Sequence, residues 1–199
     1  MMALTGCART DVVSVKSPSY DRTPQRLFVA ATLGAPFRVD PTAQLPTDSQ
    51  IWFRNKLIAV LQSCGISSEV ELVDGPAPDS PPDPSALEFL LGVHSATQTG
   101  SDPTPASPLS QRAQAFAPDA ILRIQLVSTI MGRAPSAAIR SQVPSAAYHL
   151  DMTDWTSNQV VWQADQTITH GSDFASVFEK SFVGQMVKDK ILPASCIAD

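Results

Sequence analysis

Two histidines and two aspartates in the second half of the chain could support metal binding or acid–base catalysis. They are His149, Asp151, Asp154 and His170. Residues two apart on a β-strand lie on the same face, so His149 and Asp151 would stand side by side there. Imidazole and carboxylate groups bind transition metals and transfer protons in enzymes. No third ligand follows at a recognised spacing, however, and the alternation with apolar residues also fits an ordinary solvent-facing strand surface.

The common catalytic and cofactor-binding motifs are absent. The sequence has no G-x-S-x-G, no P-loop, no G-x-G-x-x-G, no H-E-x-x-H and no C-x-x-C. The formal net charge is −5 and the lysines and arginines are scattered, which argues against a nucleic-acid-binding surface. We therefore expect a protein that is not an enzyme, with no cofactor and no metal site. A periplasmic ligand- or metal-binding protein or enzyme that uses the His149/Asp151 face is the alternative.

The quartet Leu-Thr-Gly-Cys at residues 4–7 resembles the lipobox of bacterial lipoproteins. In that motif small residues let a signal peptidase approach the backbone, and the cysteine thiol carries diacylglycerol. Cys7 would then become the mature N-terminus, with residues 1–6 as a signal-peptide remnant and residues 7–25 as a lipidated polar tether, in which the short apolar segment "VVSV" could form an edge strand. Ala8, in place of Asp, implies retention at the outer membrane, on its periplasmic face. No apolar stretch reaches the roughly 18 residues that a transmembrane helix needs, so we expect a lipid anchor.

The other two cysteines, Cys64 and Cys196, could form a disulfide. An even number of remaining cysteines is typical of a bridge in an oxidising compartment, and each lies at or just beyond the end of a predicted helix. The bridge would join residues 132 positions apart. The alternative is a buried Cys64 thiol on an apolar helix face and a free Cys196 near the C-terminus.

A strand–helix–strand unit is predicted in the first half of the chain. Residues 26–34 form a continuous apolar run, as in a strand that is covered on both faces. The next helix has Thr47 and Gln50 at the spacing of a capping box, and Gly65 as a left-handed cap at its end. Residues 68–74 then alternate as a second strand. The apolar stripe of the helix consists of Phe53, Leu57, Val60, Leu61 and Cys64.

The second half of the chain predicts further strands and a final helix. Residues 108–116 fit a short helix, residues 120–130 alternate as a half-buried strand, and residues 145–171 fit a hairpin. Residues 172–192 have the pattern of an amphipathic helix. The order predicts one α/β (α+β) domain over residues 26–194. It would be a two-layer sandwich with a mixed sheet of about five strands and helices packed on one face.

The tryptophans and the proline-rich segments are candidates for contacts with a partner. Trp155 falls in the predicted hairpin turn and is expected to be exposed, which makes it the candidate partner contact. Trp162 is expected in the core, and Trp52 beside the helix stripe. The proline-rich residues 75–84 and 102–108 could form an interaction surface of this protein's own.

The hairpin "DWTSNQVVW" at residues 154–162, together with the order of elements, resembles a family of small envelope lipoproteins. These have a TolB-N-terminal-like, or anticodon-binding-like, α/β domain, as in penicillin-binding-protein activator and curli-type secretion lipoproteins. Their hairpin has the pattern D-x-x-T-G-x-x-x-W, in which Ser157 here replaces the glycine. The resemblance implies a structural hairpin with no catalytic residue. It also implies a protein partner in an envelope assembly, such as a secretion or transport complex or a cell-wall synthase. A subunit of an oligomeric secretion ring is a further alternative.

Overall fold

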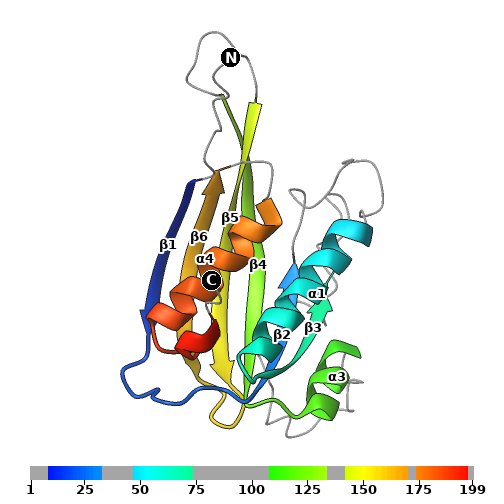
Figure 1. Cartoon of the computed structure of the whole chain (residues 1–199), viewed down its shortest axis with the longest axis vertical. Helices are drawn as coiled ribbons and strands as arrows, with labels where there is room; N and C mark the ends of the chain where they lie inside the picture. The colour runs from blue at the N-terminus through cyan, green and yellow to red at the C-terminus, as the bar shows by residue number, and fades with distance from the viewer. Residues whose placement is uncertain (1–8, 33–46, 74–107, 134–141, 170–173, 197–199) are drawn as a thin grey trace, which may run out of the picture.

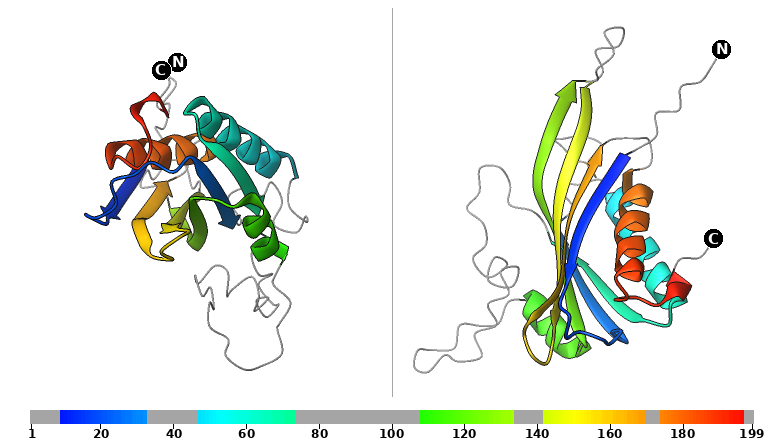
Figure 2. Two further views of the ribbon diagram at one scale, coloured as in Figure 1. Left: turned by 90° about the horizontal axis from the view of Figure 1, so that it is seen from below. Right: turned by 90° about the vertical axis from the view of Figure 1, so that its left-hand side faces the viewer.

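Within the described residues, a six-stranded mixed sheet carries helices α1 and α4 on one face and helix α3 on the other (Figure 1; Figure 2). The computed structural model describes residues 9–32, 47–73, 108–133, 142–169 and 174–196. The strands are β1 (Arg9–Lys16), β2 (Arg26–Thr32), β3 (Ser67–Leu72), β4 (Ala120–Arg133), β5 (Gln142–Asp154) and β6 (Val160–Thr169). The helices are α1 (Thr47–Ser63), α3 (Pro108–Phe116), α4 (Phe174–Lys188) and the 3-10 helix η2 (Ala194–Cys196). The predicted α/β class is confirmed, with one strand more than expected.

The sheet order is β1-β6-β5-β4-β2-β3. Strand β2 lies between β3 and β4 and runs parallel to both, so α1 is the crossover of the predicted strand–helix–strand unit. Strands β4, β5 and β6 form an antiparallel meander, and β1 adds to its outer edge, antiparallel to β6. The sixth strand is therefore β1, which the sequence analysis placed within the tether at residues 7–25. The sheet begins at Arg9, ahead of the domain start expected at residue 26.

Helix α1 ends as its sequence predicts, at a glycine in the left-handed conformation. Gly65 has φ +80°, and its N–H donates to the Gln62 carbonyl at 2.9 Å. The Ile66 N–H donates to the Leu61 carbonyl at 3.0 Å, which completes the hydrogen-bond pair typical of this kind of helix end. The turn directs the chain into β3 and buries Ile66 in the core. The stripe residues that are fully buried are Phe53, Leu57 and Leu61.

Strand β2 is buried on both faces, as its continuous apolar run predicts. Leu27, Val29 and Ala31 face the main core under α1 and α4. Phe28 and Ala30 face the opposite side, where they pack with residues of α3 in a second, smaller cluster. Figure 2 shows α3 on the side of the sheet away from α1 and α4. The helices therefore cover both faces near β2, whereas the sequence analysis expected them on one face.

The turn between β5 and β6 is held by an aspartate side chain. Asp154 Oδ1 accepts hydrogen bonds from the Ser157 backbone N–H at 2.8 Å and from the Ser157 hydroxyl at 2.9 Å. Asn158, one residue later, takes the left-handed conformation with φ +53°. Counted from Asp154, the glycine position of the D-x-x-T-G-x-x-x-W pattern is Asn158 and not Ser157, so the residue in the left-handed conformation stands where the pattern has its glycine. Asparagine tolerates this conformation better than most residues because its short polar side chain bonds locally.

Candidate functional site

The face proposed for catalysis or metal binding contains a buried ion pair. Asp151 on β5 lies directly opposite Arg123 on β4, and the Arg123 Nε–H donates to Asp151 Oδ1 at 2.7 Å. Both residues are buried, at 4% and 6% exposure. Burial raises the pKa of the Asp151 carboxyl, while the Arg123 guanidinium acts in the opposite direction. The carboxylate is therefore engaged by Arg123, contrary to the expectation that this strand face is simply solvated.

His149 and Asp151 have different side-chain partners and do not form a common site. Its Nδ1 lies 2.7 Å from Oδ1 of Asp165, which stands opposite His149 on β6 and is largely exposed. Asp154, a third member of the sequence group, is used by the β5–β6 turn and by an ion pair with Arg22. His170 lies outside the described residues. Among those that are described, no group of three His, Cys, Asp or Glu side chains could hold a metal ion.

Trp155 is half-buried, so the expectation that it is exposed is wrong. It packs against the small cluster beneath α3, which includes Phe28 and Ile121, and its backbone N–H donates to the Asp119 carbonyl at 2.9 Å. The exposed tryptophan is Trp52 on α1, at 44% exposure. Local sequence does not encode the burial of Trp155, because the packing of α3 against it depends on contacts distant in the chain.

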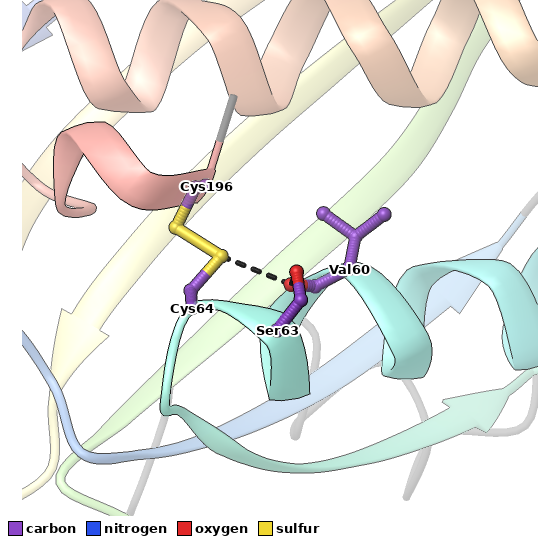
Figure 3. Close-up of a disulfide and its surroundings, with 4 residues drawn as sticks. All are labelled: Val60, Ser63, Cys64 and Cys196. Carbon is purple, nitrogen blue, oxygen red and sulfur yellow. Dashed lines mark hydrogen bonds between the residues drawn. A yellow bond between two sulfur atoms is a disulfide. The ribbon is translucent and has the colours of Figure 1, made fainter. Parts of the chain in front are cut away.

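Cys64 and Cys196 are joined in a disulfide, with their Cα atoms 4.8 Å apart (Figure 3). Cys64 directly follows the last residue of α1, and Cys196 ends η2, which follows α4. The bridge therefore joins the end of the last described segment to the end of the first helix. Cys196 is buried at 5% exposure, beside the main core. Of the two alternatives left open by the sequence, the structure shows the disulfide.

Strand β1 is attached to the body of the domain by side chains as well as by its ladder with β6. The carboxylate of Asp189, just after α4, accepts hydrogen bonds from the Ser14 hydroxyl at 2.6 Å and from the Trp162 indole N–H at 2.8 Å. Gln185 Nε2 donates to the Ser14 hydroxyl oxygen at 2.8 Å and to the Asp189 carboxylate at 3.0 Å. Tyr20, after β1, is also buried in the main core. Residues of the expected tether thus contribute directly to the fold.

The opposite face of β1 exposes two apolar side chains. Val13 and Val15 are 71% and 69% exposed, and their register partners on β6 are Asp165 and Gln163. Strand β1 also lies at the end of the sheet order. An exposed edge strand that carries apolar residues is a surface prone to pair with another chain. The sequence signal was the short "VVSV" segment, which resembled an edge strand but gave no indication of which side chains stay exposed.

Comparisons with known proteins find weak similarity to several solved structures. No known protein family matches the sequence, and no curated protein matches it. The PelC dodecamer from Paraburkholderia phytofirmans is 15% identical over 96% of this chain and 99% of that chain, with a TM-score of 0.43. The lipoprotein GNA1162 from Neisseria meningitidis is 14% identical over 83% and 99%, with a TM-score of 0.37. The hypothetical protein CT253 from Chlamydia trachomatis is 14% identical over 85% and 99%, with a TM-score of 0.34. These values support no functional conclusion, and the TolB-like resemblance stays a prediction.

Cys7 and most of the proline-rich segments lie outside the described residues. The structure therefore leaves the lipidation site as the sequence predicted it. Of the helices in the described ranges, none has the length and apolar character needed to cross a bilayer. The structure adds three features to the candidates: the disulfide, the attachment of β1 through Asp189, and the exposed face of β1 at Val13 and Val15.

Proposed function

We propose that this chain is a lipid-anchored protein of the bacterial cell envelope that binds a protein partner and has no enzymatic activity. The observation that carries the proposal is the Leu-Thr-Gly-Cys quartet at residues 4–7, which begins within a few residues of β1. Of the three cysteines, Cys64 and Cys196 are bonded to each other. Cys7 is then the remaining cysteine, and its thiol is the group that diacylglycerol would modify. A disulfide is also typical of proteins outside the reducing cytosol.

The proposed location is the periplasmic face of the outer membrane, and the proposed partner is an envelope assembly. Candidates are a secretion or transport complex and a cell-wall synthase. We propose the open face of β1 as the contact surface in place of Trp155, because Val13 and Val15 are exposed there while Trp155 is half-buried. The β1 edge could also accept a strand from the partner, since main-chain hydrogen bonds at a sheet edge are a common mode of peptide recognition.

The anchor is tested by expressing the natural gene with Cys7 intact or as Cys7→Ser. The cells are fed a palmitate analogue and their membranes are fractionated. We expect label and membrane association for the wild type, and neither for Cys7→Ser. A wild-type protein that takes no label and stays in the soluble fraction contradicts the anchor and the envelope location together.

The partner surface is tested by photo-crosslinking in cells. A photoreactive amino acid at Val13 should capture one defined envelope protein. The matched control is Ile51, which is also apolar and exposed but lies on α1 in the helical layer. Equal capture from both positions, or none from Val13, contradicts the assignment of this surface.

A ring subunit is the second candidate, and the sheet order favours it. Strands β1 and β3 are the two ends of the sheet, and nothing in the described part of the chain pairs with their outer edges. Because β1 runs antiparallel to β3, copies could join edge to edge with every N-terminus on the same side. Native mass spectrometry distinguishes a closed oligomer from a monomer directly.

A further inference from the structure

The middle of strand β1 lacks the features that usually keep the edge of a sheet from pairing with another chain. Exposed edges are commonly protected by proline, by a bulge or by charged side chains. The ladder of β1 with β6 runs from Arg9 to Lys16 without a shift in register, and no proline lies in that range. The four residues 12–15, "VVSV", carry no charge. Strand β1 therefore presents a regular, uncharged stretch at the end of the sheet (Figure 1).

The main-chain groups of alternate β1 residues point to the open edge. The Ser17 N–H donates to the Val161 carbonyl at 2.9 Å, so the odd-numbered residues of β1 direct their N–H and C=O groups toward β6. The even-numbered residues Val12, Ser14 and Lys16 therefore direct theirs toward the open edge. These groups are available to a further strand without any rearrangement of the sheet.

A second copy of β1, related to the first by a two-fold axis at Ser14, matches these groups. Ser14 would lie opposite Ser14 of the second copy, and Val12 opposite Lys16, which gives about six main-chain hydrogen bonds. Val13 of each copy would lie opposite Val15 of the other. These are non-hydrogen-bonded pairs, in which opposite side chains approach most closely. Each valine would thus pair with a valine on the face of the sheet that faces away from α4.

Other pairings of the same edge match the side chains less well. A two-fold axis at Val13 would place the Asp11 carboxylate opposite Val15 of the second copy. Pairing of β1 with the β3 edge of another copy would bring Val13 and Val15 beside Glu69 and Glu71. These glutamates lie on the same face of the sheet as the valines, because their register partners on β2 face α3. The chemistry of the β1 edge therefore favours a second β1 as its occupant.

We propose that two copies of this chain pair edge to edge through β1, in antiparallel orientation, with Ser14 at the two-fold axis. Val13 and Val15 of both copies then form one apolar patch across the axis, which is larger than the pair of exposed valines that one copy offers. The pairing follows from the strand itself. The role of the joint patch in binding the envelope partner rests on the proposed function.

The two-fold pairing also restricts how two anchored copies can lie. Arg9 of one copy would be level with Ser19 of the other, so the two Arg9 residues would be about 33 Å apart along the ladder. If both Cys7 side chains carry lipid as proposed, the paired β1 strands would lie along the bilayer surface, with the two-fold axis perpendicular to it.

Cysteine crosslinking tests the register in the full chain that carries Cys7→Ser. With the native disulfide intact, an introduced cysteine is the sole free thiol. A Val13→Cys protein mixed with a tagged Val15→Cys protein should give the mixed disulfide as the main product of mild oxidation. Either variant alone should give little crosslinked product, because its two equivalent Cα atoms would be more than ~7 Å apart. Gln163→Cys, exposed on the same face one strand away on β6, is the matched control and should not crosslink to either variant.

Charge substitution tests whether the pairing forms the dimer. Native mass spectrometry should find the parent protein at twice the mass of one chain. The double variants Val13→Lys/Val15→Lys and Val13→Glu/Val15→Glu should each be monomeric, because like charges would lie opposite each other. An equimolar mixture of the two variants should restore a dimer with one copy of each. Both side chains are highly exposed, at 71% and 69%, so the circular dichroism of each variant should be unchanged.

A parent protein that stays monomeric overturns the proposal, and so does a closed oligomer of more than two copies, which supports the ring in its place. Crosslinking of Val13→Cys to itself in preference to Val15→Cys also overturns it. The proposed function fails separately. A dimer in which a photoreactive residue at Val13 captures only the second copy contradicts the partner surface and supports the pairing. A monomer that captures a defined envelope protein supports the partner surface and overturns the pairing.

Discussion

Removing the Cys64–Cys196 bridge should strongly destabilise the domain, because the bridge closes a long loop. The two cysteines are 132 residues apart in sequence. The loss of loop-closure entropy in the unfolded chain is about 2.1 + 1.5R ln 132 cal/mol/K, or close to 17 cal/mol/K. At 25 °C this corresponds to about 5 kcal/mol of stabilisation. For a native protein with a typical total of about 5–15 kcal/mol, the bridge supplies a large share.

The assay is urea unfolding of the folded domain, followed by circular dichroism. Both arms carry Cys7→Ser, so that no other thiol can exchange. The test arm adds Cys64→Ala and Cys196→Ala, which remove the bridge with small side chains at both sites. With a slope of ~2 kcal/mol per molar urea, a loss of about 5 kcal/mol lowers the midpoint by roughly 2.5 M.

A reduced but otherwise unchanged protein serves as the control. It loses the same cross-link without any substitution, so its midpoint should agree with that of the double variant. Alkylation before reduction should find no free thiol at position 64 or 196 in protein purified without a reducing agent. A midpoint shift below about 0.5 M, or roughly 1 kcal/mol, would refute the loop-closure reasoning.

Three further predictions concern two glycines of different conformation, the buried ion pair and the attachment of β1. Gly65→Ala should lower the free energy of unfolding by about 1 kcal/mol because φ is +80° there. Gly184→Ala, in open space within α4, should raise it by roughly 0.5–1 kcal/mol, and shifts of the same sign in both variants would contradict this reasoning. Arg123→Met should lower the free energy of unfolding by about 3–5 kcal/mol because it leaves the Asp151 carboxylate buried without its cation. Adding Asp151→Leu to that variant should restore most of the lost free energy in the same urea assay. Asp189→Ala should lower the free energy of unfolding by ~1–3 kcal/mol and increase the rate of amide hydrogen exchange in β1. An unchanged exchange rate would show that the Asp189 carboxylate does not hold β1 in place.

Local sequence patterns predicted the elements that depend on local chemistry. The apolar run that became β2, the apolar stripe of α1 and the left-handed cap at Gly65 are each encoded within a few residues. The β5–β6 hairpin was predicted for the same reason, because turn residues separate two alternating segments. These features need no knowledge of which distant segment lies beside them.

The features that the sequence did not predict depend on pairing between distant segments. Strand β1 lies in the expected tether, where the "VVSV" segment was a weak strand signal, and its partner β6 lies about 150 residues later in the chain. Asp151 had the alternation of a solvated strand face, but the β4–β5 register places Arg123 directly opposite and allows both to be buried. Trp155 is covered because α3 packs on the far side of the sheet. Periodicity reports which face a side chain takes, and it does not report what covers that face.

The position of β1 changes how an anchored protein of this kind would reach a partner. With residues 7–25 as a free tether, the domain could move tens of ångströms from the membrane at ~3.3–3.6 Å per residue. With the sheet starting at Arg9, only Ala8 would separate an acylated Cys7 from the first strand. If Cys7 carries lipid as proposed, the domain would be held against the bilayer, and a partner would have to approach the membrane to meet it. The open β1 face would then start beside the proposed anchor, so a partner bound there would contact this chain and the lipid surface together.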